Sequence, residues 1–292
     1  ELIPLERTED PDAFIGSSPT NRKRVYGGQM MAQSLLAAAR TAPEGWPVHS
    51  LHTYFISPGD ARSPLEFRVQ RHRDGRRYAS RTVLVEQGDR LVAQIAASLH
   101  SPEPRVAGRL DHGASAPSAP DPETLVPAEA LLADSRTAPT GQLFRATDAI
   151  DSRHVEDQPA ISRLNGEDLP LTTRVWMRFR ERLDDAPLTH QIALTYLSDT
   201  SLADTAVARY GIVRELDGVE NASLDHSAWF HRPFRADEWL LYVASSPAAS
   251  GERGLIQARV FSRDGAHVAT TTQEMLFRLP VGLGAPDEPG PR

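Results

Sequence analysis

The chain has 292 residues, a formal net charge of −7 and no cysteine. The acidic charge argues against nucleic acid as the main partner, and the missing cysteines exclude disulfides, thiolate metal sites and a cysteine nucleophile. No apolar run approaches the roughly 18 residues of a membrane span, so we expect no membrane partner and a cytoplasmic location.

Two stretches of the sequence resemble each other. Residues 52–59 and 223–234 share the pattern aromatic-Phe-x-x-Pro, and the segment 81–94 is matched by 257–270. Repetition of this kind indicates an internal duplication, with each half at the usual size of a domain. The chain is therefore predicted to hold two copies of one unit.

The first copy is predicted to be a buried helix with antiparallel strands. A glycine turn at Gly27–Gly28 leads into residues 30–40, which are helix-forming and apolar on nearly all sides, as buried helices are. Strands are expected at 12–16, 48–56, 65–73, 77–87 and 90–100. This order predicts a sheet wrapped around a central helix.

The second copy repeats this order of elements. Strands are expected at 142–155, 172–182, 223–231, 239–246, 254–262 and 267–279, with an apolar segment at 191–197. Asp199 lies in a cluster of helix-start residues, and Ser201 with Asp204 resembles a capping box, so a helix is predicted from there to Gly211.

Proline content and turn residues predict the domain boundaries. We expect an N-terminal unit at 1–101, a proline-rich crossover at 102–141 with a short helix near 128–133, a C-terminal unit at 142–279 and a flexible tail at 280–292.

The two copies differ in three polar residues. Aligning the closing strands sets Ala97 against Gln273, whose amide lies on an otherwise apolar face and costs roughly 1–3 kcal/mol unless it is paired. Asp199 and Ser223 likewise place an acid and a hydroxyl in the second copy. The simpler interpretations are a helix cap for Asp199 and packed polar groups for the other two. Other chemistry is not indicated, because the sequence lacks Gly-x-Ser-x-Gly, His-Glu-x-x-His and a glycine-rich phosphate loop, and His49 and His52 would point to opposite faces of a strand. No metal and no cofactor are expected.

Several motifs together resemble the acyl-CoA thioesterase II family. They are residues 25–29 (VYGGQ), 49–60 (HSLHTYFISPGD), 225–234 (DHSAWFHRPF) and 272–274 (TQE). The resemblance implies a double hotdog fold of the α+β class, with two long central helices, each wrapped by a curved antiparallel sheet, and the sheets joined into one. It also implies that Asp199, Ser223 and Gln273 hold a hydrolytic water. Ser223 takes the place of a threonine in the family and lacks the methyl group that stiffens that rotamer.

The resemblance further implies hydrolysis of acyl-CoA to free fatty acid and CoA, as part of fatty acid metabolism. Asp199 would be the general base, Ser223 and Gln273 would orient the water, and backbone N–H groups at Gly27–Gly28 would stabilise the oxyanion. The alternatives are an enoyl-CoA hydratase and a non-catalytic acyl-CoA binder. Arginines at 22–24 or 71–77 could hold the CoA phosphates, and exposed sheet edges together with the resemblance predict a homo-oligomer.

Overall fold

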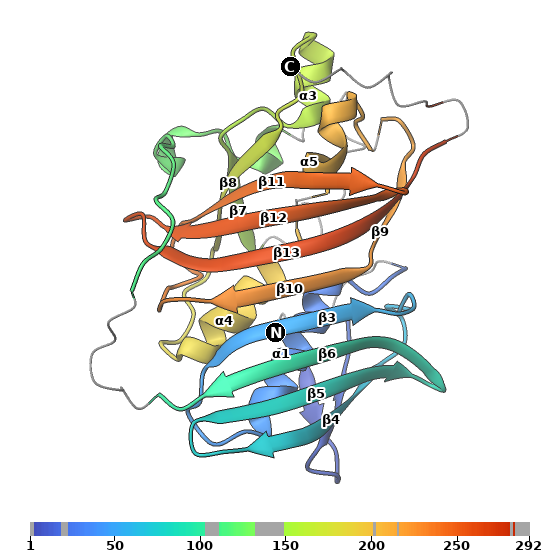
Figure 1. The fold of residues 1–292 in the computed structure, drawn as a ribbon, viewed down its shortest axis with the longest axis vertical. Coiled ribbons are helices and arrows are strands. Elements are labelled where there is room, and N and C mark those ends of the chain that lie inside the picture. Colours follow the sequence, from blue (N-terminus) through green and yellow to red (C-terminus); the bar gives the residue numbers. More distant parts are fainter. Residues whose placement is uncertain are drawn as a thin grey trace.

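The computed structural model describes residues 3–18, 23–102, 111–131, 149–200, 203–214, 216–280 and 283. All of its strands belong to one antiparallel sheet in the order β1-β2-β4-β5-β6-β3-β10-β13-β12-β11-β8-β7, with β9 paired to β13 (Figure 1). The first half contributes β1 (Leu5–Arg7), β2 (Ala13–Gly16), β3 (Val48–Phe55), β4 (Leu65–Asp74), β5 (Tyr78–Gln87) and β6 (Arg90–His100). The second contributes β7 (Ile150–His154), β8 (Thr172–Phe179), β9 (Glu220–Ser223), β10 (Asp225–Phe230), β11 (Leu240–Ser250), β12 (Arg253–Ser262) and β13 (His267–Arg278).

The two halves are joined at the pair β3 and β10. In this pair His52 lies opposite Ser227, and the His52 Nδ1 and Ser227 Oγ atoms are 3.0 Å apart. A shift of 175 residues superposes the aromatic motif of one strand on that of the other, and it also converts residue 52 into residue 227. The β3–β10 pair is therefore symmetric about the His52–Ser227 position, as expected when two copies of one unit pair through the same strand.

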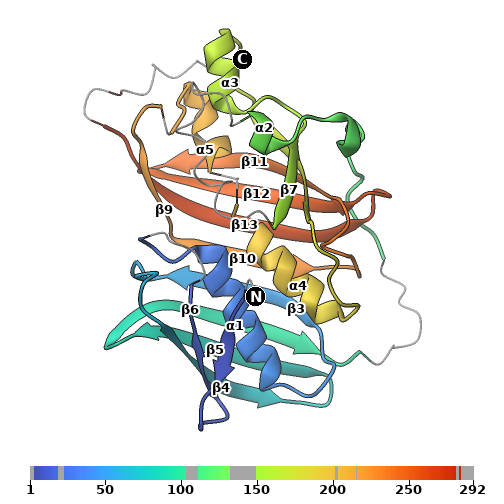
Figure 2. The ribbon, with the colours of Figure 1, turned by 180° about the vertical axis from the view of Figure 1, so that it is seen from behind.

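Two helices lie side by side on one face of the sheet, α1 (Gly27–Arg40) and α4 (Pro187–Leu197) (Figure 2). Their side chains and the inward faces of both sets of strands form one continuous apolar core. The start of α1 contacts the end of α4, since the hydroxyl of Tyr26 donates to the carbonyl oxygen of Tyr196 at 2.9 Å. The predicted helix and strands of the first half are confirmed.

The central helix of the second half lies earlier in the sequence than predicted. It is the apolar segment that ends at Leu197, so Asp199 follows this helix instead of starting one. Pro187 suits the first helical turn, and every residue from His190 to Leu197 is buried. The predicted later helix is reduced to the short α5 (Asp204–Val207) and a 3-10 turn that ends at Gly211 with φ +67°. Ser201, the expected cap, lies outside the described residues.

The crossover includes a 3-10 turn, η1 (Pro122–Thr124), and the short helix α2 (Ala128–Leu131). A further short helix that sequence reasoning did not predict, α3 (Pro159–Asn165), follows β7. Residues 103–110 and 132–148, the rest of the predicted crossover and the start of the predicted strand 142–155, lie outside the described residues, as does the tail beyond Pro280 apart from Leu283.

Candidate active site

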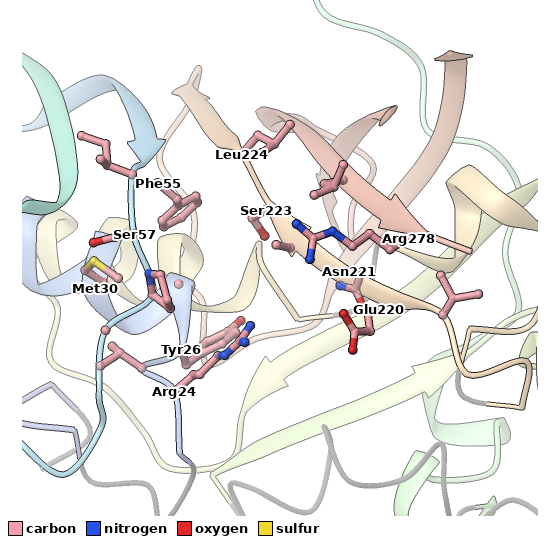
Figure 3. A pocket seen from close by; sticks show the side chains of 18 residues that line it. Arg24, Tyr26, Met30, Phe55, Ser57, Glu220, Asn221, Ser223, Leu224 and Arg278 are labelled. Carbon is pink, nitrogen blue, oxygen red and sulfur yellow. The ribbon is translucent and has the colours of Figure 1, made fainter. Parts of the chain in front are cut away.

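A pocket of about 790 Å³ lies where the start of α1, the end of β3 and strand β9 meet (Figure 3). Gly27 and Ser223 are on its wall, together with apolar groups from the first half such as Met30 and Phe55. The lining is completed by Arg24, Val25, Tyr26, Ile56, Ser57, Pro58, Gly59, Val219, Glu220, Asn221, Ala222, Leu224, Leu276 and Arg278. Both halves of the chain thus contribute to one cavity.

The three polar residues singled out in the sequence meet beside this pocket. The Nε2 atom of Gln273 donates to Asp199 Oδ1 at 2.7 Å and to Ser223 Oγ at 2.7 Å. The buried amide therefore uses both of its N–H groups on the other two members, and the cost of burying it is offset by these bonds.

The first half also holds the carboxylate. The backbone N–H of Gly28 donates to Asp199 Oδ2 at 2.8 Å. This N–H belongs to the first turn of α1, where the helix dipole favours negative charge. It was expected to bind an oxyanion; instead it binds the carboxylate. A Cβ atom at Gly27 would lie 2.8 Å from the same oxygen, so glycine lets the helix approach Asp199 closely.

Strand register positions the hydroxyl and the amide. Ser223, the last residue of β9, lies opposite Met275 on β13, two residues beyond Gln273. Gln273 itself lies opposite Ile256 of β12 in the sheet interior. Asp199 is supplied by a helix and not by the sheet, since it follows the end of α4 by two residues.

A buried histidine supports the segment that carries Asp199. The Nε2 atom of His226 and the Oγ atom of Ser198 are 2.9 Å apart, and both residues are buried. Burial lowers the pKa of His226 to about 4, and the side chain of Gln273 opposes part of this effect. The imidazole is therefore neutral at physiological pH and serves a structural role.

Two contacts of the site were missed by sequence reasoning. The Gly28–Asp199 and Tyr26–Tyr196 hydrogen bonds join residues 171 and 170 positions apart. The glycine pair was read as a helix start, and no local signal identifies its partner. Asp204, the other carboxylate near Asp199 in the sequence, forms an ion pair with Arg214 at 2.7 Å.

The positive charges at the pocket differ from those expected. Arg24, one of the residues considered for the CoA phosphates, lines the pocket, and Arg278 from β13 lines it as well (Figure 3). Arg71 is paired with Asp12 at 2.7 Å, and Arg22 lies outside the described residues. Over the described ranges, no group of three or more His, Asp or Glu side chains is arranged to hold a metal ion. No helix in these ranges is long and apolar enough to cross a membrane.

Comparison with known proteins is consistent across both halves. Residues 16–100 match the acyl-CoA thioesterase N-terminal domain, and residues 116–277 match the acyl-CoA thioesterase C-terminal domain. Acyl-coenzyme A thioesterase 8 of Mus musculus is 33% identical, over 92% of this chain and 86% of that protein. Acyl-CoA thioesterase 2 of Haemophilus influenzae is 32% identical, over 95% and 96%.

Solved structures agree with these relatives. The acyl-CoA thioesterase II TesB2 of Mycobacterium marinum has a TM-score of 0.76 and 33% identity, over 96% of this chain and 97% of that chain. A hot dog protein of Alicyclobacillus acidocaldarius has a TM-score of 0.73 at 21% identity, over 95% and 97%, a likeness of fold alone. The single sheet and these neighbours define a double hotdog protein. The chain belongs to the acyl-CoA thioesterase family and is a thioester hydrolase.

Proposed function

We propose that this protein hydrolyses acyl-CoA thioesters to fatty acid and CoA with a water held by Asp199, Ser223 and Gln273. The proposal is carried by one observation: the Gln273 amide bonds the carboxylate and the hydroxyl at once, beside a pocket that both halves line. Family membership supports the thioester as the reacting group.

The hydrogen bonds define which group of the site donates a proton and which accepts one. Ser223 Oγ accepts an N–H from Gln273, so its own proton is left to donate to the water or to the acyl carbonyl. Asp199 Oδ1 accepts an N–H from Gln273 and Oδ2 accepts one from Gly28, and a carboxylate oxygen can accept a second hydrogen bond, here from the water. A water that donates to Asp199 is thereby oriented with its lone pair free to attack.

The reaction then proceeds by addition and elimination. Asp199 removes a proton as the water oxygen bonds to the carbonyl carbon, and the tetrahedral intermediate collapses with cleavage of the C–S bond. The thiol has a pKa near about 8.5, so the thiolate departs with little acid assistance. The proton held by Asp199 passes to the departing sulfur, which regenerates the carboxylate of Asp199 and gives the free thiol of CoA. The acid product keeps the second proton of the water and loses it to solvent as it leaves as a carboxylate.

The pocket suits the two ends of the substrate. Arg24 and Arg278 in its lining provide positive charge for the phosphates of CoA. Met30 and Phe55 provide apolar surface near the start of α1 for the acyl chain. Glu220 lines the same pocket, so its charged residues are two arginines and one glutamate, in a chain whose net charge is −7.

The test is release of free thiol from an acyl-CoA by purified variants. We expect Asp199→Asn to lower kcat by about 10²–10⁴-fold, the usual contribution of a general base. Asp204→Asn is the matched control, since it neutralises a neighbouring carboxylate that is paired with Arg214. Ser223→Ala should cost about 2- to 13-fold, as for one neutral hydrogen bond, and Ser223→Thr should keep the activity.

Other outcomes would point to the alternative functions. Near-normal thiol release by Asp199→Asn would refute the proposed base. Consumption of an enoyl-CoA without thiol release would identify a hydratase, and tight binding without turnover in the wild type would identify a binding protein. The expected cytoplasmic location and homo-oligomer stay predictions; light scattering in solution measures the second.

A further inference from the structure

One polar side chain in the lining of the pocket lies outside the proposed hydrolytic group. Asn221 is on β9, two residues before Ser223, so the two side chains leave the strand on the same face. Both line the pocket, as Figure 3 shows. At the spacing of a strand, the Cα atoms of Asn221 and Ser223 are about 7 Å apart. A ligand whose reacting carbonyl lies at Ser223 therefore passes Asn221 when it extends along β9.

An arginine fixes the orientation of the Asn221 amide. Arg214 Nη1 donates to Asn221 Oδ1 at 2.8 Å. A guanidinium has N–H donors and no acceptor, so the amide atom that faces it is the oxygen, and Nδ2 is the other end of the amide. Arg214 is held in turn by Asp204, with Nε 2.7 Å from Oδ1 and Nη2 3.2 Å from Oδ2. An asparagine at position 204 still offers Arg214 an oxygen, so the Asp204→Asn control keeps this arrangement.

The N–H groups of Asn221 Nδ2 are unused. They have no acceptor among the described residues, and Asn221 is only half-buried. Other hydroxyls of the pocket lining already donate within the protein. The Ser57 hydroxyl donates to the carbonyl oxygen of Leu91 at 2.7 Å, and the Tyr26 hydroxyl donates to that of Tyr196 at 2.9 Å. Asn221 therefore presents N–H donors to the pocket that a ligand or a water must satisfy.

The position of Asn221 matches an uncharged part of the substrate. Arg278 lies opposite Glu220 in the β9–β13 register, three residues from Ser223, or about 10 Å along the strand. Asn221 thus lies between the proposed site of the thioester and an arginine proposed to meet the phosphates. In acyl-CoA this stretch is the pantetheine arm, which has two neutral amides. Five bonds join the thioester carbon to the carbon of the first amide, roughly 6 Å when extended, close to the spacing from Ser223 to Asn221.

We propose that Asn221 Nδ2 donates a hydrogen bond to the carbonyl oxygen of the first pantetheine amide and so selects thioesters of CoA over thioesters of simple thiols. The inference rests on the proposed function for the position of the thioester at Ser223. Asn221 does not touch the reacting atoms, and its bond is the same before and during the reaction. Its loss therefore raises KM and leaves kcat unchanged.

Three thioesters of one acyl group test the proposal on the full-length protein. Octanoyl-CoA holds the whole arm, the octanoyl thioester of N-acetylcysteamine keeps only the first amide, and S-pentyl thiooctanoate has no amide. Asn221→Leu, of similar volume and without a donor, should lower kcat/KM about fivefold for the first two, the value of one neutral hydrogen bond, and leave the third unchanged. Asn221→Asp keeps an oxygen for Arg214 but turns an acceptor toward the amide carbonyl, so its loss should be at least as large.

The same substitution at a remote position is the control. Asn165 is exposed at the end of α3 and outside the pocket, so Asn165→Leu should change none of the three rates. Unchanged kcat/KM for octanoyl-CoA in both Asn221 variants would overturn the inference. An equal loss on S-pentyl thiooctanoate would do so too, because it would show a general effect on the pocket.

Binding of CoA separates this inference from the proposed hydrolysis. CoA holds the same amide, and calorimetric titration measures its Kd without turnover. Asn221→Leu should weaken this Kd about fivefold, whereas Asn165→Leu should not change it. A weakened Kd in a protein that releases no thiol from acyl-CoA would refute the hydrolysis and keep the contact. An unchanged Kd would refute the contact and leave the hydrolytic site standing.

Discussion

Replacing Gln273 by methionine separates the role of its amide from the fold. Methionine has a similar volume and shares the face of Ala269 and Met275, so the core should repack with little change in the melting temperature. The substitution removes both N–H donors, which hold Asp199 and Ser223 at 2.7 Å each.

The size of the effect follows from those two bonds. A hydrogen bond to a charged group is worth about 1.5–3 kcal/mol and one to a neutral hydroxyl about 0.5–1.5 kcal/mol. If both are needed to orient the water, their sum of roughly 2–4.5 kcal/mol corresponds to a loss of about 30- to 2,000-fold in kcat. The measurement is thiol release at saturating acyl-CoA, together with thermal unfolding of the same sample.

Thr271→Val is the matched control for this substitution. Thr271 lies two residues away on the same strand and is also buried, and its hydroxyl has no partner among the described residues. The change removes a buried polar group next to the site without touching Asp199 or Ser223, so kcat should be unaltered. A Gln273→Met enzyme within threefold of the wild type, or an equal loss in Thr271→Val, would refute the reasoning.

Two further predictions concern the start of α1 and the buried histidine. A Cβ atom at Gly28 would lie 2.6 Å from the backbone oxygen of Tyr196, so Gly28→Ala should displace α1 from Asp199 and lower both kcat and the melting temperature. Gly88→Ala, at a remote turn with φ +60°, is the control and should lower the melting temperature alone. Equal losses of kcat in the two variants would contradict the role given to Gly28. The pKa of His226 is about 4 when folded, against about 6.5 in an unfolded chain, so the unfolded state binds more protons between these values. The free energy of unfolding should therefore fall as the pH falls below about 6.5, by about 2 kcal/mol at pH 5 from this residue, and level off below about 4. Denaturant titrations of wild type and His226→Gln across this range measure the difference, and identical slopes would show that His226 is not responsible.

The sequence was most informative where local pattern decides structure. Alternation and turn residues predicted the strands from Leu65 to His100 and from Arg253 to Arg278 within a few residues, because side-chain period and hairpin turns are local properties. The internal repeat allowed the strands of the second half to be predicted by comparison with those of the first. Gln273 was singled out by comparison of the copies, since Ala97 is its counterpart in the first. The roles of Asp199 and Ser223 came from the family resemblance, because Asp199 had been compared with the wrong helix end.

The central helix of the second half was placed wrongly for a physical reason. Residues from His190 to Leu197 are buried on all sides, so they show no amphipathic period that would distinguish a helix from a strand. The Ser-Asp-Thr-Ser cluster that follows favours a helix start, and it was interpreted in that way. The partner of Asp199 on α1 could not be predicted either, because a backbone N–H at Gly28 carries no side-chain signal.

The bond from Gly28 to Asp199 has a consequence for how such a chain can change. The carboxylate that would do the chemistry belongs to one copy, and the backbone that fixes its second oxygen belongs to the other. Because of this hydrogen bond, the two copies can no longer change independently of each other. Substitutions in the first turn of α1 are constrained by Asp199, which lies 171 residues later in the sequence. A gene fusion of this kind is hard to reverse, because separating the copies would leave each with an incomplete reaction centre.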